Sequence, residues 1–142
     1  MTRLLLAVLF AILMVSQVNA QSTLALQEKC AEGAKKFFFE GGNNFSQRDK
    51  DGLWANNYQS HYSKSLDKCF ILLISLYSPK AKGEPVLWSK TLYDVFEGKS
   101  YGSLFRTQYE NFNWPIKECI VRDKICHSEG EFDALIKPYM EE

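Results

Sequence analysis

The residue types best suited to chemistry lie near the C-terminal end of the sequence. Cys119 and Cys126 are seven positions apart in "KECIVRDKICHS", and His127 follows the second cysteine. A c-type haem requires two residues between its cysteines, whereas six separate these. A structural zinc ion needs four nitrogen or sulfur ligands, and this stretch offers three; the fourth would have to be His61 or another cysteine. A disulfide across a hairpin fits best, and we predict neither a metal nor a cofactor.

The chain contains four cysteines, an even number, which is typical of two disulfides in an exported protein. Four cysteines allow three connectivities, and the sequence alone does not choose among them. We expect Cys30–Cys69 and Cys119–Cys126. With a two-residue turn, the second pair would face each other at a hydrogen-bonded position, where strands lie farther apart, so a bulge or longer loop would help.

The stretch "RDKDG" partly matches a calcium-binding loop. With Gly52 as the invariant glycine, Asp49 and Asp51 fall on ligand positions. The first ligand position is then Gln47 and the last, which should be an acid, is Tyr58. Because the loop fails at both ends, a solvated turn is the better interpretation.

The only histidines are His61 and His127. A hydrolase would pair one of them with a serine and an acid, and the candidates are Ser60, Ser63, Ser128, Asp67 and Asp94. Neither the spacing nor any G-x-S-x-G or H-E-x-x-H motif favours this arrangement. A hydrolase using His61 or His127 is therefore the alternative hypothesis, and we predict no catalytic residue.

Aromatic residues are abundant, with 3 Trp, 7 Tyr and 10 Phe. Most should belong to the core. Four lie in or beside predicted loops, where aromatic side chains can form a binding surface: Trp54, Trp88, Tyr109 and Trp114. Packing beneath loops is the commoner role for any one of them.

Two helices should frame the elements that carry these residues. In 23–40, apolar residues recur at helical spacing, and Gly41-Gly42 is a natural stop. Ser128 and Glu131 have capping-box spacing before an apolar stripe, which predicts a C-terminal helix that ends or kinks at Pro138.

The residues between the helices predict antiparallel strands. The polar stretch 43–57 should be a loop, and 58–63 alternates like a strand. Residues 68–78, "KCFILLISLYS", are apolar on both faces, so this central strand must be covered on both sides. Two hairpins should follow, turning near Gly98-Lys99 and at Arg122-Asp123.

The predicted fold class is α+β, with an N-terminal helix, an antiparallel sheet of five or six strands built of hairpins, and a short C-terminal helix. A curved sheet wrapped around the first helix, as in cystatin-like folds, is the preferred analogy.

The first twenty residues predict export. Arg3 precedes an apolar run at 4–15, and Val18 and Ala20 have the spacing that a signal peptidase requires. We expect residues 1–20 to be a signal peptide and 21–142 to be a single disulfide-linked domain, periplasmic or secreted, with no membrane span after cleavage. The charge is nearly balanced, with 17 basic and 17 acidic residues, which disfavours nucleic acid as a partner.

Four stretches, "KCAEGAKKFF", "YQSHYSKSLDKCF", "LYDVFEGKSYG" and "KICHSEGEFDALIKPYM", resemble a group of small, uncharacterised exported bacterial proteins with paired cysteines. The resemblance implies a bacterial exported domain and favours the periplasm, and it supplies no activity. Our hypothesis is a non-catalytic module that binds another protein or an envelope component, with an inhibitor of a hydrolase as one version. The sequence does not predict an oligomeric state.

Overall fold

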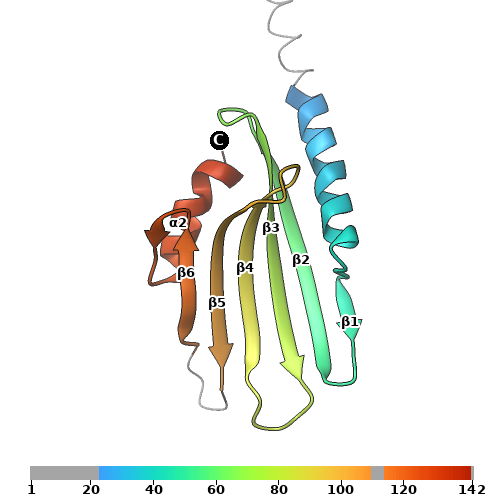
Figure 1. Cartoon of the computed structure of the whole chain (residues 1–142), viewed down its shortest axis with the longest axis vertical. Coiled ribbons are helices and arrows are strands. Elements are labelled where there is room, and N and C mark those ends of the chain that lie inside the picture. The colour runs from blue at the N-terminus through green and yellow to red at the C-terminus, as the bar shows by residue number, and fades with distance from the viewer. Residues whose placement is uncertain (1–22, 110–113, 142) are drawn as a thin grey trace, which may run out of the picture.

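The computed structural model describes residues 23–109 and 114–141. A helix over residues 23–40 precedes seven strands and the helix α2 (Glu129–Met140). The strands are β1 (Ser46–Arg48), β2 (Gly52–Ser63), β3 (Lys68–Pro79), β4 (Val86–Asp94), β5 (Ser100–Gln108), β6 (Ile116–Val121) and β7 (Lys124–Ile125). Each strand pairs antiparallel with the next in the chain, so the sheet is a simple meander (Figure 1). This confirms the predicted α+β class, with seven strands where five or six were expected.

The N-terminal helix has the predicted extent. Its buried residues Cys30, Ala34 and Phe38 follow one another at intervals of four, so they form one stripe facing the sheet. The helix ends as expected at the glycine pair, where Gly42 adopts a φ of 77°. The amide of Gly42 donates to the carbonyl of Phe39, which satisfies one of the free carbonyls of the last turn.

The predicted loop at 43–57 is wrong, because this stretch contains β1 and the first half of β2. The carboxylate of Asp49 accepts hydrogen bonds from the amides of Asp51 and Gly52, which closes a tight turn between the two strands. All three residues of β1 are exposed. β1 therefore lacks the alternation of buried and exposed residues that identifies a strand in sequence.

The central strand β3 is covered on both faces, as its sequence predicted. Leu72 packs in one cluster with Phe132 of α2, whereas its neighbour Ile71 packs in another with Ala34 of the N-terminal helix. Since neighbouring strand residues point to opposite faces, the two helices lie on opposite sides of the sheet. The cystatin-like analogy thus accounts for the N-terminal helix on one face of the sheet but not for α2 on the other.

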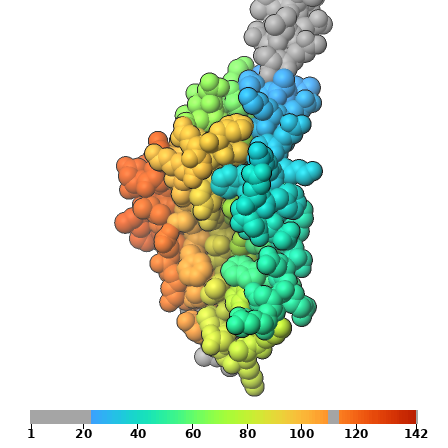
Figure 2. Space-filling model, turned by 45° about the vertical axis from the view of Figure 1, so that its right-hand side comes forward, coloured from blue at the N-terminus to red at the C-terminus, as the bar shows by residue number. Residues whose placement is uncertain are grey.

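The space-filling view shows the N-terminal helix on its face of the sheet. The helix packs over β2 and β3, and residues of β4 and β5 remain visible beside it (Figure 2). On this face, the helix consequently covers β2 and β3 more completely than β4 and β5. Within the described residues, no helix has the length and apolarity needed to cross a membrane.

Both predicted hairpin turns are present. Gly98 has a φ of 65° in the turn between β4 and β5. Arg122 has a φ of 60° between β6 and β7, a conformation that is costly for a residue with a side chain. The amide of Arg122 donates to the carbonyl of Tyr101 at 2.7 Å, and its guanidinium lies 4.5 Å from the centroid of that ring. These contacts with β5 help to hold the turn in its left-handed conformation.

Helix α2 begins at the predicted cap. The Ser128 hydroxyl accepts from the amide of Glu131 at 3.1 Å, and the Glu131 carboxylate accepts from the amide of His127 at 2.8 Å, one residue before the cap. The helix continues to Met140, two residues beyond Pro138, where an end or kink was expected. Pro138 is in the last turn and has no N–H to donate to the carbonyl of Ala134, so the helix loses one hydrogen bond here and ends within two residues.

Candidate binding site

The structure contains both predicted disulfides. Cys30 and Cys69 are joined with their Cα atoms 5.3 Å apart, and Cys119 and Cys126 with theirs 5.0 Å apart. No bulge accompanies the second bridge, because the β6–β7 pairing runs without a register shift up to the two-residue turn. The amide of Cys126 donates to the carbonyl of Cys119 at 3.0 Å, and the two strands lie close enough for the bridge. The Cys119–Cys126 pair is therefore a disulfide that links the two strands of a hairpin.

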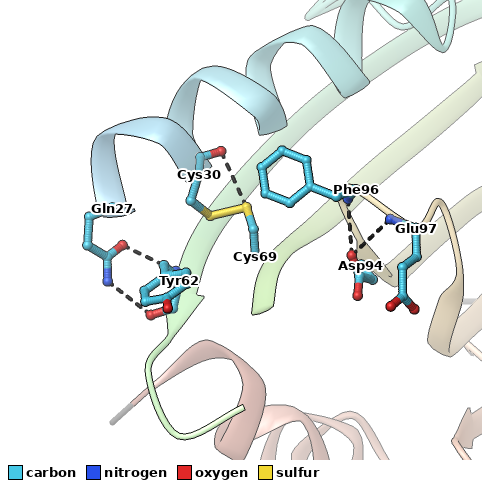
Figure 3. Close-up of a disulfide and its surroundings, with 7 residues drawn as sticks. All are labelled: Gln27, Cys30, Tyr62, Cys69, Asp94, Phe96 and Glu97. Carbon is cyan, nitrogen blue, oxygen red and sulfur yellow. Dashed lines mark hydrogen bonds between the residues drawn. A yellow bond between two sulfur atoms is a disulfide. The ribbon is translucent and has the colours of Figure 1, made fainter. Parts of the chain in front are cut away.

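The Cys30–Cys69 bridge fastens the N-terminal helix to β3 (Figure 3). One turn before Cys30, the side-chain amide of Gln27 bonds to the Tyr62 backbone twice: it donates to the carbonyl at 3.1 Å and accepts from the amide at 3.2 Å. The Sγ atom of Cys69 lies 3.4 Å from the Cys30 carbonyl oxygen, a close contact without a hydrogen, since the sulfur is oxidised. Together these contacts fix the helix against two neighbouring strands.

Asp94 is buried at the end of β4 and organises the following turn. Its carboxylate accepts from the amides of Phe96 and Glu97 at 3.0 and 3.1 Å, and from the ammonium of Lys68 at 2.7 Å. Burial by itself would raise the pKa of Asp94, but the hydrogen bonds from Lys68 and the two amides outweigh it and lower that pKa. The hydrogen bonds to Asp94 and then Glu97 raise the pKa of Lys68. Asp94 is thus a structural anion.

The candidates for a hydrolase site are not brought together. The ring atom Nε2 of His61 is buried and has no hydrogen-bond partner among the described residues. His127 lies beside the α2 cap, and its backbone amide, not its ring, contacts Glu131. Asp67 accepts from the Tyr62 hydroxyl, and Ser128 caps α2. In the part of the chain that the structure describes, no hydrogen bond joins either imidazole to these acids or serines.

The Lys80 side chain holds the turn that partly matches a calcium-binding loop. The ammonium of Lys80 donates to the backbone carbonyls of Asp49 and Lys50, both at 2.9 Å. The Asp49 side chain is occupied by the amides of its own turn, and these hydrogen bonds lower its pKa. Across residues 23–109 and 114–141 there is no group of three or more histidine, cysteine, aspartate or glutamate side chains placed to hold a metal ion.

Two of the four predicted surface aromatics meet in one pocket. Trp88 of β4 and Trp114, just before β6, line a cavity of about 300 Å³ together with Leu76, Arg106 and Glu129. Leu76, Trp88 and Arg106 are direct cross-strand partners on β3, β4 and β5. They consequently form one row across the α2 face of the sheet, and Glu129 reaches the same place from the first turn of α2.

Charged residues form one wall of this pocket. The Arg106 guanidinium pairs through Nη1 with the Glu129 carboxylate at 3.2 Å, and lies 5.2 Å from the Trp88 ring centroid. Its Nε atom is buried and has no acceptor among the described residues. Because this atom is shielded from solvent, it lies within the wall, and its unmade hydrogen bond costs about 1–3 kcal/mol.

Lys90 holds Glu129 in this wall. Only 12% of its side chain is exposed, and its ammonium contacts Glu129 at 2.8 Å and Asp133 at 2.8 and 3.1 Å. Burial acts to lower the pKa of Lys90, but the hydrogen bonds to Asp133 and Glu129 outweigh it and raise that pKa. Lys90 therefore remains charged and orients Glu129, with its own donors already used.

The other two predicted aromatics lie elsewhere. Trp54 packs against Tyr77, its partner on β3, with ring centroids 4.6 Å apart. Trp54 and Tyr62 are an even number of residues apart on β2, so their side chains point to the same face of the sheet. Since Tyr62 packs towards the N-terminal helix, Trp54 lies on the face opposite Trp88. Tyr109 is 53% exposed just after β5. Neither contributes to the Trp88–Trp114 pocket.

A larger cavity, of about 440 Å³, lies among the loops at one end of the sheet, lined by Tyr77, Lys80 and Glu84 among others. Its Lys80 ammonium is already committed to two backbone carbonyls. The Trp88–Trp114 pocket combines two indoles with a guanidinium that has one ion-pair partner among the described residues, so it is the better candidate site.

No family model, curated protein or solved structure matches this chain.

Proposed function

We propose that this protein is an exported, non-catalytic binding module of the bacterial cell envelope, and that it binds its partner at the Trp88–Trp114 pocket. The observation that carries the proposal is the pocket itself, where two indoles and Arg106 line one cavity. Trp and Arg are the residue types that most often dominate binding energy at interfaces.

Export is part of this proposal. An N-terminal signal peptide over residues 1–20 and a periplasmic or secreted location are compatible with two disulfides, which persist in oxidising compartments. The resemblance to small exported bacterial proteins leads to the same proposal. The partner is another protein or an envelope component; inhibition of a hydrolase is one way in which such binding would act.

The alternative is a small hydrolase using His61 or His127. It predicts that replacing one histidine abolishes the biological effect while the fold survives. The test expresses His61→Ala, His127→Ala, Trp88→Ala and the control Trp54→Phe in a strain lacking the gene, and compares the phenotype with the melting temperature of each purified variant.

We expect Trp88→Ala to lose the effect, while both histidine variants and Trp54→Phe retain it. Loss of the effect in a histidine variant with an unchanged melting temperature would instead support the hydrolase.

A further inference from the structure

We infer that the Trp88–Trp114 pocket binds a neutral sugar ring, such as one unit of an uncharged polysaccharide. This inference rests on the proposed binding function and names the ligand class for the same site. Three features of the pocket carry it: an open indole, a wall without net charge, and a hydrogen-bond donor beside an acceptor.

Trp114 offers the pocket an open indole. It is half-buried, and no ring contact, cation contact or hydrogen bond joins it to any other described residue. The Trp88 ring, by contrast, already has Arg106 and Lys90 at 5.2 and 5.5 Å from its centroid. The face of an aromatic ring is slightly negative and attracts the weakly positive C–H groups on one side of a sugar ring. Trp114 therefore supplies the stacking face, and Trp88 and Leu76 supply the remaining apolar lining.

The charged wall of the pocket carries no net charge. Arg106, Glu129, Lys90 and Asp133 form one chain of ion pairs, with Glu129 joined to both cations and Lys90 to both acids. An anionic ligand would meet the Glu129 carboxylate and a cationic ligand the Arg106 guanidinium, and neither would find a free countercharge. Since a charged group that loses its water without gaining a partner is costly, this wall favours a neutral ligand.

The same wall suits hydroxyl groups. The Nη1 atom of Arg106 and a carboxylate oxygen of Glu129 are 3.2 Å apart, and the two side chains are 19% and 37% exposed. A guanidinium has five N–H donors and a carboxylate about four lone-pair sites, so each group can bond again without breaking the pair. The buried Nε of Arg106 takes no part. Because a sugar hydroxyl both donates and accepts, neighbouring hydroxyls can use the donor and the acceptor together.

A peptide would use these groups less completely. The cavity of about 300 Å³ is at the small end of ligand sites and holds one pyranose unit or one large side chain. An apolar side chain would make no hydrogen bond to Arg106 or Glu129. A proline, which has no N–H, would offer nothing to Glu129. A sugar ring fills the same space and bonds to both.

The test titrates the mature, oxidised protein with neutral trisaccharides and their charged counterparts. Glucose trimers are compared with glucuronate trimers, and N-acetylglucosamine trimers with cationic glucosamine trimers. The three indole N–H resonances are followed by NMR and assigned with Trp→Phe variants. We expect a neutral trimer to shift the signals of Trp88 and Trp114 and not that of Trp54, and to bind at least about tenfold more tightly than its charged counterpart.

Two variants separate stacking from charge. Trp114→Ala should weaken neutral-sugar binding about tenfold or more, whereas Trp54→Phe, on the opposite face of the sheet, should leave it unchanged. Asp133→Asn keeps every lining residue and gives the wall a net charge of about +1, so the affinity for glucuronate trimers should rise about twofold or more relative to glucose trimers. The matched control Glu40→Gln, exposed on the N-terminal helix, should change neither affinity.

Equal affinities for neutral and charged trimers, or a Trp114→Ala variant that binds as the parent does, would overturn the inference. An unchanged preference in Asp133→Asn would show that the neutral wall does not select the ligand, and would overturn it too. If proline-containing peptides shift Trp88 and Trp114 and no sugar does, the ligand class is wrong and the binding site stands. If the native partner protects a different surface, both proposals fail.

Discussion

The two disulfides should differ in their contribution to stability. Cys30 and Cys69 are 39 residues apart in sequence, whereas Cys119 and Cys126 are 7 apart. In the loop-entropy model, closing the longer loop in the unfolded chain is worth about 4 kcal/mol, and closing the shorter loop about 2.5 kcal/mol. All four cysteines are buried, so replacement by alanine removes a similar amount of packing from each pair. The difference of about 1.5 kcal/mol therefore isolates the loop contribution.

Two double variants, Cys30→Ala/Cys69→Ala and Cys119→Ala/Cys126→Ala, are compared with the parent by urea unfolding. We expect the first to lose about 4 kcal/mol and the second about 2.5 kcal/mol in free energy of unfolding. The first variant should also bind a dye specific for exposed apolar surface, because the helix that covers Ile71 is no longer tied to β3. Equal losses, or a larger loss from the hairpin pair, would refute this reasoning.

Three further predictions concern the fold that carries the site. Asp94→Asn should lower the free energy of unfolding by about 1–3 kcal/mol at neutral pH, since it removes the ion pair to Lys68. The folded-state pKa of Asp94 lies below its ordinary value of 3.8, so its contribution to the free energy of unfolding is fully present above that value and is lost as the pH falls through the folded-state pKa. The free energy of unfolding of the variant should therefore fall less steeply with decreasing pH than that of the parent. An identical dependence on pH would contradict this. Ser128→Ala should cost about 1 kcal/mol in thermal unfolding, and Ser128→Asp should restore it; no loss with alanine would show that the cap is unimportant. Gly102→Ala should destabilise the protein, because the added Cβ would lie 2.9 Å from the Ile120 carbonyl oxygen. Gly130→Ala, in open space on α2, should stabilise it by about 0.5–1 kcal/mol. A higher melting temperature for Gly102→Ala than for Gly130→Ala in calorimetry would refute the packing argument.

The elements with a strong periodic pattern were predictable from sequence. The N-terminal helix has buried residues at helical spacing, β3 is a continuous apolar run bounded by turn residues, and the capping residues of α2 are local in sequence. The first half of β2 was missed because its pairing with β3 joins residues that are distant in sequence, such as Gly52 and Pro79. Residues such as Asn57 are exposed on β2 and give no apolar signal.

The pocket was only partly predictable. Trp88 and Trp114 were singled out by type, but nothing in the sequence separates them from Trp54, which lies on the opposite face. Arg106 was missed because it joins Trp88 only through the β4–β5 register, and Glu129 because it arrives with α2. The spacing of Trp88 and Lys90, two apart on one strand, was the sole local sign that charge would accompany the indole.

The Trp88–Trp114 pocket is the proposed binding site for the partner. Hydroxyl-radical footprinting of the mature protein, with and without an extract of its native envelope, measures the oxidation of every tryptophan in one experiment. We expect the extract to protect Trp88 and Trp114, Trp54 to be oxidised equally in both samples, and Arg106→Gln to reduce the protection. Equal oxidation of Trp88 and Trp114 in both samples, with protection of another surface, would contradict it.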